Sequence, residues 1–175
     1  MPRFPLSIDL TGQPVLLIGH GPMAEEKFEK LQPFGADIRR LDRLTAKHLL
    51  PRPALVIVAD GSPEEKERSS ALCREHHIPV NVVDAPALCT FFFPALTTRG
   101  DMTISVSTDG KSPAAAAILR KTIEETLPEN LEEILTWTQT LRGQLPRESL
   151  LQAIAQAFTQ NRPLTEEEIA ALYRP

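Results

Sequence analysis

The run Gly19–Ala24 reads Gly-His-Gly-Pro-Met-Ala and matches the pattern G-x-G-x-x-G/A of loops that bind the pyrophosphate of a dinucleotide. The first glycine allows a tight turn, the second lets the backbone approach the phosphates, and a small third residue lets a helix pack closely on its strand. A tight turn without a ligand would look the same. Here the loop follows an apolar run and opens a helical pattern, so the positive end of the helix dipole can face the phosphates. We therefore predict that a nucleotide binds at Gly19, His20, Gly21, Pro22, Met23 and Ala24.

Charged residues downstream of this loop bear on which nucleotide binds. An acidic residue about 20 positions after the glycine pattern is expected to bind the ribose hydroxyls, and Asp42 stands near that spacing. Arg43 follows it directly, with Arg39 and Arg40 before it, and an arginine here could accept a 2′-phosphate instead. The carboxylate of Asp42 favours NAD over NADP, with Arg43 beside the cofactor.

Asp84 is the candidate for chemistry. It ends the apolar run Pro79–Val83, and open α/β sheets bind their ligands outside the carboxyl ends of their strands. A solvated turn residue is the alternative.

The histidines and cysteines share no metal-ligand spacing, so no metal site is predicted.

The elements that must position these residues follow from the hydrophobic pattern. Continuous apolar runs, typical of strands buried on both faces, alternate with helical patterns that start at prolines. The predicted strands cover residues 15–18, 36–41, 54–59 and 79–83, and the predicted helices begin at Pro22 and span about 63–75. This order predicts an α/β fold with a Rossmann-like parallel sheet over residues 1–93.

The pattern changes after Asp84. Met102–Ser107 alternates apolar and polar residues, as a half-exposed strand does, and Ser112-Pro113 opens an alanine-rich helix to about Glu125. Only helical patterns follow. We therefore expect a small α/β region at 94–125 and a helical C-terminal domain at 126–175.

Composition excludes several classes of protein. With 42% hydrophobic and 24% charged residues the chain has the composition of a globular protein. No apolar stretch reaches the roughly 20 residues of a membrane span, and the N-terminus lacks the pattern of a signal peptide. A net charge of −4 creates no strong field for nucleic acid. We expect a cytoplasmic protein without a membrane or nucleic-acid partner.

Several separated motifs resemble one known family. In chain order they are Phe4-Pro5-Leu6, the glycine loop, Asn81-Val82-Val83-Asp84, Phe92-Phe93-Pro94-Ala95, and the run from Ile104 to Pro113. Together they are similar to the bacterial precorrin-2 dehydrogenases, which occur alone or as the N-terminal part of sirohaem synthase. The similarity covers about residues 3–125.

The resemblance implies a homodimer that uses NAD to oxidise precorrin-2 to sirohydrochlorin, with residues 94–125 as the dimerisation region. It implies that Asp84 is the catalytic residue. It also implies substrate contacts at the residues Asn81, Ser107, Thr108, Lys111 and Ser112. Arg99, Arg120 and Lys121 add cations for a polycarboxylate substrate, although an ordinary solvated face is an equal alternative.

Two departures from the family keep other functions open. The span between Asp42 and Ala54 is too short for the usual loop, strand and helix, so the sheet is expected to lack a strand. Asp60-Gly61-Ser62 replaces the usual threonine and paired aspartates, and Lys66 replaces a common asparagine, which we expect to weaken contacts to the nicotinamide. One alternative is a ferrochelatase that inserts Fe²⁺ into sirohydrochlorin. Another is a non-catalytic dimer that binds a tetrapyrrole.

Overall fold

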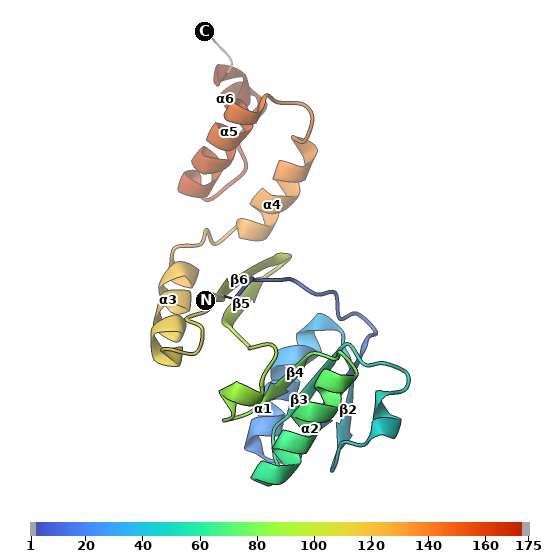
Figure 1. Cartoon of the computed structure of the whole chain (residues 1–175). Helices are drawn as coiled ribbons and strands as arrows, with labels where there is room; N and C mark the ends of the chain where they lie inside the picture. The colour runs from blue at the N-terminus through green and yellow to red at the C-terminus, as the bar shows by residue number, and fades with distance from the viewer. Residues whose placement is uncertain (1–2, 173–175) are drawn as a thin grey trace. The chain divides into compact units, whose positions relative to one another are not determined.

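The computed structural model describes residues 3–172 and divides the chain into two compact units, Met1–Phe93 and Pro94–Pro175 (Figure 1). Each unit has its own sheet. The first unit contains a four-stranded parallel sheet and the second a two-stranded sheet followed by helices. Each unit is therefore described separately.

The sheet of the first unit has the strand order β2-β1-β3-β4. Its strands are β1 (Pro14–Ile18), β2 (Asp37–Leu41), β3 (Leu55–Val58) and β4 (Val80–Val82). All neighbouring pairs are parallel. The chain runs outward from β1 to β2 and then crosses to β3 on the other side of β1. The carboxyl ends of β1 and β3 are therefore the switch point where ligands of such sheets bind.

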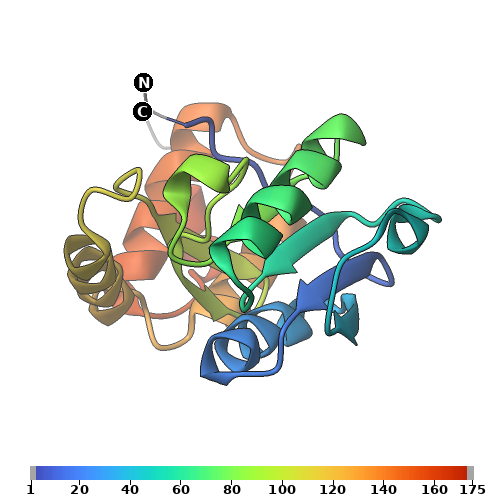
Figure 2. The ribbon, with the colours of Figure 1, turned by 60° about the horizontal axis from the view of Figure 1, so that its bottom comes forward.

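Two helices cover opposite faces of this sheet, α1 (Pro22–Leu31) and α2 (Pro63–Glu75) (Figure 2). Alternate residues of a strand point to opposite faces. Val15, Leu17 and Ile57 accordingly share one buried cluster with Ala24 of α1. Leu16, Ile18, Val56 and Val58 are buried in a second cluster with Cys73 of α2. Burial raises the pKa of the Cys73 thiol to about 12, so this thiol stays protonated in the core.

Local signals fix where α2 begins. The hydroxyl of Ser62 accepts a hydrogen bond from the Glu65 N–H at 3.3 Å, and the Glu65 carboxylate accepts one from the Ser62 N–H at 3.3 Å. This reciprocal capping satisfies two N–H groups at the start of the helix, and Pro63 needs none. The helix occupies the residues that the sequence predicts.

The connection from β2 to β3 is short. It holds one 3₁₀ turn, Ala46–Leu49, and, within residues 3–172, no strand between β2 and β3. The six-stranded order of a full dinucleotide fold places a further strand outside β2. Here β2 is the edge strand and has exposed and half-buried residues but no buried ones, so the loss of a strand predicted from the short span is confirmed.

The second unit begins with the antiparallel pair β5 (Ala95–Arg99) and β6 (Met102–Val106). The sequence predicted β6 but not β5. Ala95–Arg99 carries no alternating pattern, and pairing with β6 across a turn at Gly100, where φ is +55°, makes it a strand. The helices are α3 (Pro113–Glu125), α4 (Leu131–Thr140), α5 (Arg147–Gln160) and α6 (Glu166–Ala171).

Two packing layers hold the second unit together. Helix α3 packs on β5 and β6. A separate buried cluster joins Ile134 of α4 to Ala153 and Ala157 of α5 and to Leu164. Whether residues 94–125 and 126–175 act as distinct domains stays a prediction.

Candidate functional site

The glycine loop joins β1 to α1 at the carboxyl edge of the sheet. Gly19 has φ +111°, a conformation that side chains disfavour, and its N–H donates to the Leu41 carbonyl at 3.0 Å. Gly21 is the N-cap of α1, and Pro22 occupies the first turn. Ala24 is fully buried against the sheet. The loop therefore combines a tight turn, a helix N-terminus and close helix packing, as a pyrophosphate site requires.

A carboxylate lies in this loop. Asp60 lies just after the end of β3, which is the strand next to β1. Its Oδ2 accepts hydrogen bonds from the N–H of His20 at 3.0 Å and of Gly21 at 2.9 Å. These N–H groups are the donors that the loop offers to an anion. From the sequence, Asp60 is expected to affect contacts to the nicotinamide. In the structure it contacts the phosphate-binding amides instead, because β3 lies next to β1 in the sheet.

Asp42 lies one residue beyond the end of β2 and is highly exposed. Its Oδ1 lies 2.8 Å from His20 Nε2, and the side chains are 94% and 59% exposed, respectively. Asp42 and His20 therefore stand together beside the glycine loop, where ribose hydroxyls would lie near a pyrophosphate. Met23, in the first turn of α1, is also partly exposed.

The arginines near Asp42 are engaged by carboxylates. Arg39 pairs with Asp37 at 2.7 Å and Arg40 pairs with Glu25 at 2.7 Å. Arg43 lies 3.6 Å from Glu65. A 2′-phosphate would have to compete with these carboxylates for each arginine.

Asp84 lies just beyond β4 at the same edge of the sheet. It is exposed and has φ +61°, a conformation that aspartate and asparagine adopt more readily than most residues. Lys66 of α2 donates from Nζ to the Val83 carbonyl at 3.0 Å, which places a cation one residue from Asp84. In the sequence Lys66 stands out only as a departure from the family, because its position beside Val83 depends on how α2 packs against β4.

Asn81 has a structural role in the free protein. It is 8% exposed, and its amide Nδ2 donates to the Phe91 carbonyl at 3.0 Å. This bond ties β4 to the segment that ends the first unit. A contact between Asn81 and substrate would require the bond to open.

The predicted substrate residues of the second unit form the turn between β6 and α3. The Thr108 hydroxyl accepts from the Ser112 N–H at 3.1 Å and donates to the Ser112 carbonyl at 3.0 Å. The Ser112 hydroxyl caps α3 by accepting from the Ala115 N–H at 3.2 Å, and the Ser107 hydroxyl accepts from the Asp109 N–H at 3.3 Å. These three hydroxyls therefore shape the turn.

The four basic residues of this unit that were suggested as substrate contacts differ in whether they already have a hydrogen-bond or ion-pair partner. Arg120 pairs with Glu124, and Lys121 lies 3.8 Å from Glu125. Arg99 donates to the Pro128 carbonyl at 3.1 Å. Lys111 is exposed and has no ion pair with the residues that the structure describes. Of the four, Lys111 is the most available to a substrate carboxylate.

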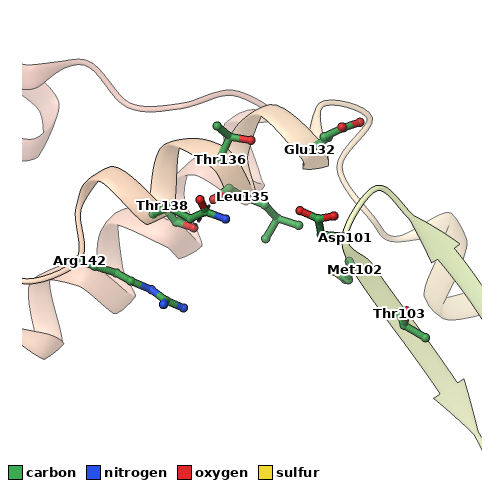
Figure 3. Close-up of a pocket in the computed structure, with 9 residues that line it drawn as sticks. Asp101, Met102, Thr103, Glu132, Leu135, Thr136, Thr138 and Arg142 are labelled. Carbon is green, nitrogen blue, oxygen red and sulfur yellow. Dashed lines mark hydrogen bonds between the residues drawn. The ribbon is translucent and has the colours of Figure 1, made fainter. Parts of the chain in front are cut away.

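A hollow of about 420 Å³ lies within the second unit, between the β5–β6 turn and α4 (Figure 3). Asp101 and Glu132 lie at one end and Arg142 at the other, with Leu135 between them. None of the cofactor-binding, catalytic or substrate-binding residues predicted from the sequence lines it. One cation facing two carboxylates does not suit a ligand with many carboxylates.

Two kinds of structural feature are not found in the described part of the chain. Among residues 3–172, no three His, Cys, Asp or Glu side chains are grouped to hold a metal ion. Within the same described part of the chain, no helix is long and apolar enough to cross a membrane.

Comparisons with family profiles cover both units. Residues 6–95 match the family described as "Putative NAD(P)-binding". Residues 99–126 match the family described as "Sirohaem biosynthesis protein central". The first match alone spans more than half of the chain, and its end lies near the boundary between the units.

Curated relatives of the chain include several siroheme synthases. The enzyme of Gluconobacter oxydans (strain 621H) is 34% identical over 80% of this chain and 35% of the relative. That of Psychrobacter sp. (strain PRwf-1) is 31% identical over 83% of this chain and 34% of the relative. The chain thus spans about a third of the length of these relatives.

A solved structure has the same fold. It is described as SirC, precorrin-2 dehydrogenase, and superposes with a TM-score of 0.61 over 97% of this chain and 96% of that chain, at 16% identity. The glycine loop lies at the switch point of the sheet, where a nucleotide is expected to bind, and residues 6–95 around it match the NAD(P)-binding family. The chain therefore belongs to the family described as "Putative NAD(P)-binding", and its residues 99–126 match the central domain of sirohaem biosynthesis proteins.

Proposed function

We propose that the chain is an NAD-dependent oxidoreductase that converts precorrin-2 to sirohydrochlorin. The observation that carries the proposal is the glycine loop, whose His20 and Gly21 amides form an anion site at the N-terminus of α1. Family membership supports the cofactor class, and the siroheme synthase relatives support the substrate. Asp84 at the same sheet edge supplies the residue that the chemistry needs.

The residues of the loop fit a dinucleotide. A Cβ added at Gly21 would lie 3.1 Å from the Asp60 Oδ2, so a side chain there would occupy the space that an anion uses. The loop amides would hold the pyrophosphate and Asp42 the ribose hydroxyls. Bound there, the nicotinamide ring supplies the hydride acceptor.

The protein must also remove a proton when precorrin-2 loses a hydride. We assign this step to Asp84, whose exposed carboxylate can accept the proton on an Oδ atom as the general base. Lys66, held at the Val83 carbonyl, would attract a carboxylate of the tetrapyrrole toward Asp84. In the second unit, Lys111 stays a predicted contact to a substrate carboxylate.

We propose NAD rather than NADP as the cofactor because the nearby arginines already have carboxylate partners. Asp42→Asn is expected to weaken NAD⁺ binding by about 10- to 100-fold, since a hydrogen bond to a charged group contributes about 1.5–3 kcal/mol. Calorimetric titration with NAD⁺ and NADP⁺ measures both affinities. Glu29→Gln, at an exposed position of α1, is the control. Tighter binding of NADP⁺ than NAD⁺ by the wild type would refute the assignment.

We also propose a homodimer formed through residues 94–125. The apolar residues Met102, Ile104 and Val106 of β6 are only half-buried, and Leu119 on α3 is 51% exposed. Sedimentation is expected to give a mass of about twice 19.4 kDa. Leu119→Glu should give monomers, because burying an unpaired charge in an interface is strongly unfavourable.

Leu151→Glu is the matched control for the dimer. Leu151 has a similar exposure, 58%, but lies on α5, outside the proposed interface. It should remain dimeric. Wild-type monomers at all micromolar concentrations, or equal effects of the two substitutions, would contradict the assignment of the interface to residues 94–125.

The function is tested by anaerobic incubation of the protein with precorrin-2, with and without NAD⁺, while absorption spectra are recorded. NAD⁺-dependent formation of sirohydrochlorin is the expected result. A parallel sample with sirohydrochlorin and Fe²⁺ tests for a ferrochelatase. Metal insertion without NAD⁺-dependent oxidation would favour the chelatase, and binding without either reaction would favour a non-catalytic dimer.

A further inference from the structure

Asp60 occupies the anion site of the glycine loop in this structure. Its Oδ2 accepts from two backbone N–H groups, those of His20 at 3.0 Å and Gly21 at 2.9 Å. Hydrogen bonds from N–H to an ionised acceptor are about twice as strong as neutral ones. The carboxylate therefore satisfies the donors that a phosphate would otherwise use.

The loop wraps closely around this side chain. A Cβ added at Gly19 would lie 2.5 Å from the Asp60 Oδ2 and 2.7 Å from the Asp60 Cβ, and one added at Gly21 would lie 3.1 Å from Oδ2. Both glycines of the pattern therefore leave room for Asp60 in this structure. A pyrophosphate placed on the same amides would meet a carboxylate of like charge.

We propose that Asp60 is an internal anion that competes with the cofactor's pyrophosphate and so sets the affinity of the chain for NAD. This inference rests on the proposed function, since it concerns the same loop. Cofactor entry requires the Asp60 side chain to leave the amides. Asp60 is exposed, so solvent is the place to which its side chain would move.

The same contact organises the loop before the cofactor arrives. Asp60 links the end of β3 to the start of α1, which are neighbours only in the folded sheet. Removing the carboxylate should lower the thermal stability of the free protein but not that of the complex with NAD⁺. Stability and affinity therefore change in opposite directions.

Asp60→Asn and Asp60→Ala test the proposal by calorimetric titration with two probes, NAD⁺ and inorganic pyrophosphate. Asparagine keeps the shape and removes the charge, and alanine empties the site. Both variants are expected to bind each probe about 10- to 100-fold more tightly than the wild type, because the competing charged acceptor is gone. Glu75→Gln removes a carboxylate at the far end of α2 and should change neither affinity.

A spectroscopic measurement tests the contact in the free protein. The amide resonances of His20 and Gly21 in the nitrogen–proton spectrum should shift on Asp60→Asn, and in the wild type they should shift when NAD⁺ is added. Unchanged resonances in Asp60→Asn would overturn the proposal without requiring any binding measurement.

The outcomes separate this inference from the proposed function. If the wild type binds NAD⁺ and the Asp60 variants bind it equally or more weakly, the competition is refuted and the cofactor assignment stands. If neither the wild type nor the variants bind NAD⁺ at millimolar concentration, both are refuted. Tight binding by the variants alone would support the competition.

Discussion

Replacing Asp84 with asparagine is expected to lower the rate of precorrin-2 oxidation by about 10²- to 10⁴-fold, the usual effect of losing a general base. This corresponds to about 3–5 kcal/mol of activation free energy. The affinity for NAD⁺ should not change, because Asp84 follows β4 while the glycine loop follows β1.

Asparagine is the suitable substitution because of the backbone at this position. Asp84 has φ +61°, and asparagine adopts this conformation about as readily as aspartate. Alanine would add backbone strain to the loss of the base. A lower rate in Asp84→Asn therefore reports on the carboxylate and not on the turn.

Steady-state rates with saturating NAD⁺ measure the effect. Glu75→Gln is the control, since Glu75 is exposed at the end of α2 and belongs to no predicted site. A wild-type rate in Asp84→Asn would make Asp84 a turn residue only. Loss of metal insertion with unchanged oxidation would assign Asp84 to a chelatase reaction instead.

Gly21→Val is expected to weaken NAD⁺ binding at least about 100-fold. Losing two charge-assisted hydrogen bonds of about 1.5–3 kcal/mol each accounts for that magnitude. Gly21 has φ −77°, which valine tolerates, so the fold should survive. The valine methyl groups would occupy the space beside the loop amides.

Gly19 would be a poorer choice for this test. Its φ of +111° and the 2.5 Å approach to Asp60 mean that a side chain at Gly19 would strain the backbone as well as block the site. Ala71→Val, at an exposed position of α2, controls for the added bulk. Calorimetry measures affinity and circular dichroism measures the fold. Equal NAD⁺ binding by Gly21→Val and the wild type would refute the cofactor site.

Much of the first unit could be predicted from sequence because its signals are local. Pro63 and the Ser62–Glu65 capping box fix the start of α2, and buried apolar runs mark the strands. β5 was not predicted, because Ala95–Arg99 is a strand only through pairing with β6. Its pairing partner lies beyond a turn that the sequence pattern did not mark.

The candidate site also has one part that could be predicted from local sequence and other parts that could not. The glycine loop is a contiguous pattern and could be read directly. The position of Asp60 on its amides depends on β3 lying next to β1, although these strands are far apart in the chain. The position of Lys66 at the Val83 carbonyl depends on the packing of α2 against β4. Strand order and helix packing are tertiary properties, and no local pattern encodes them.

Hydride transfer from precorrin-2 to NAD⁺ is the reaction that we propose for this chain. Measuring NADH and sirohydrochlorin in the same anaerobic sample tests it most directly, with Gly21→Val as the inactive control. We expect the two products to appear in equal amounts with the wild type and neither to exceed the protein-free background with Gly21→Val. Sirohydrochlorin without NADH, or equal yields from the wild type and Gly21→Val, would contradict hydride transfer to NAD⁺ by this chain.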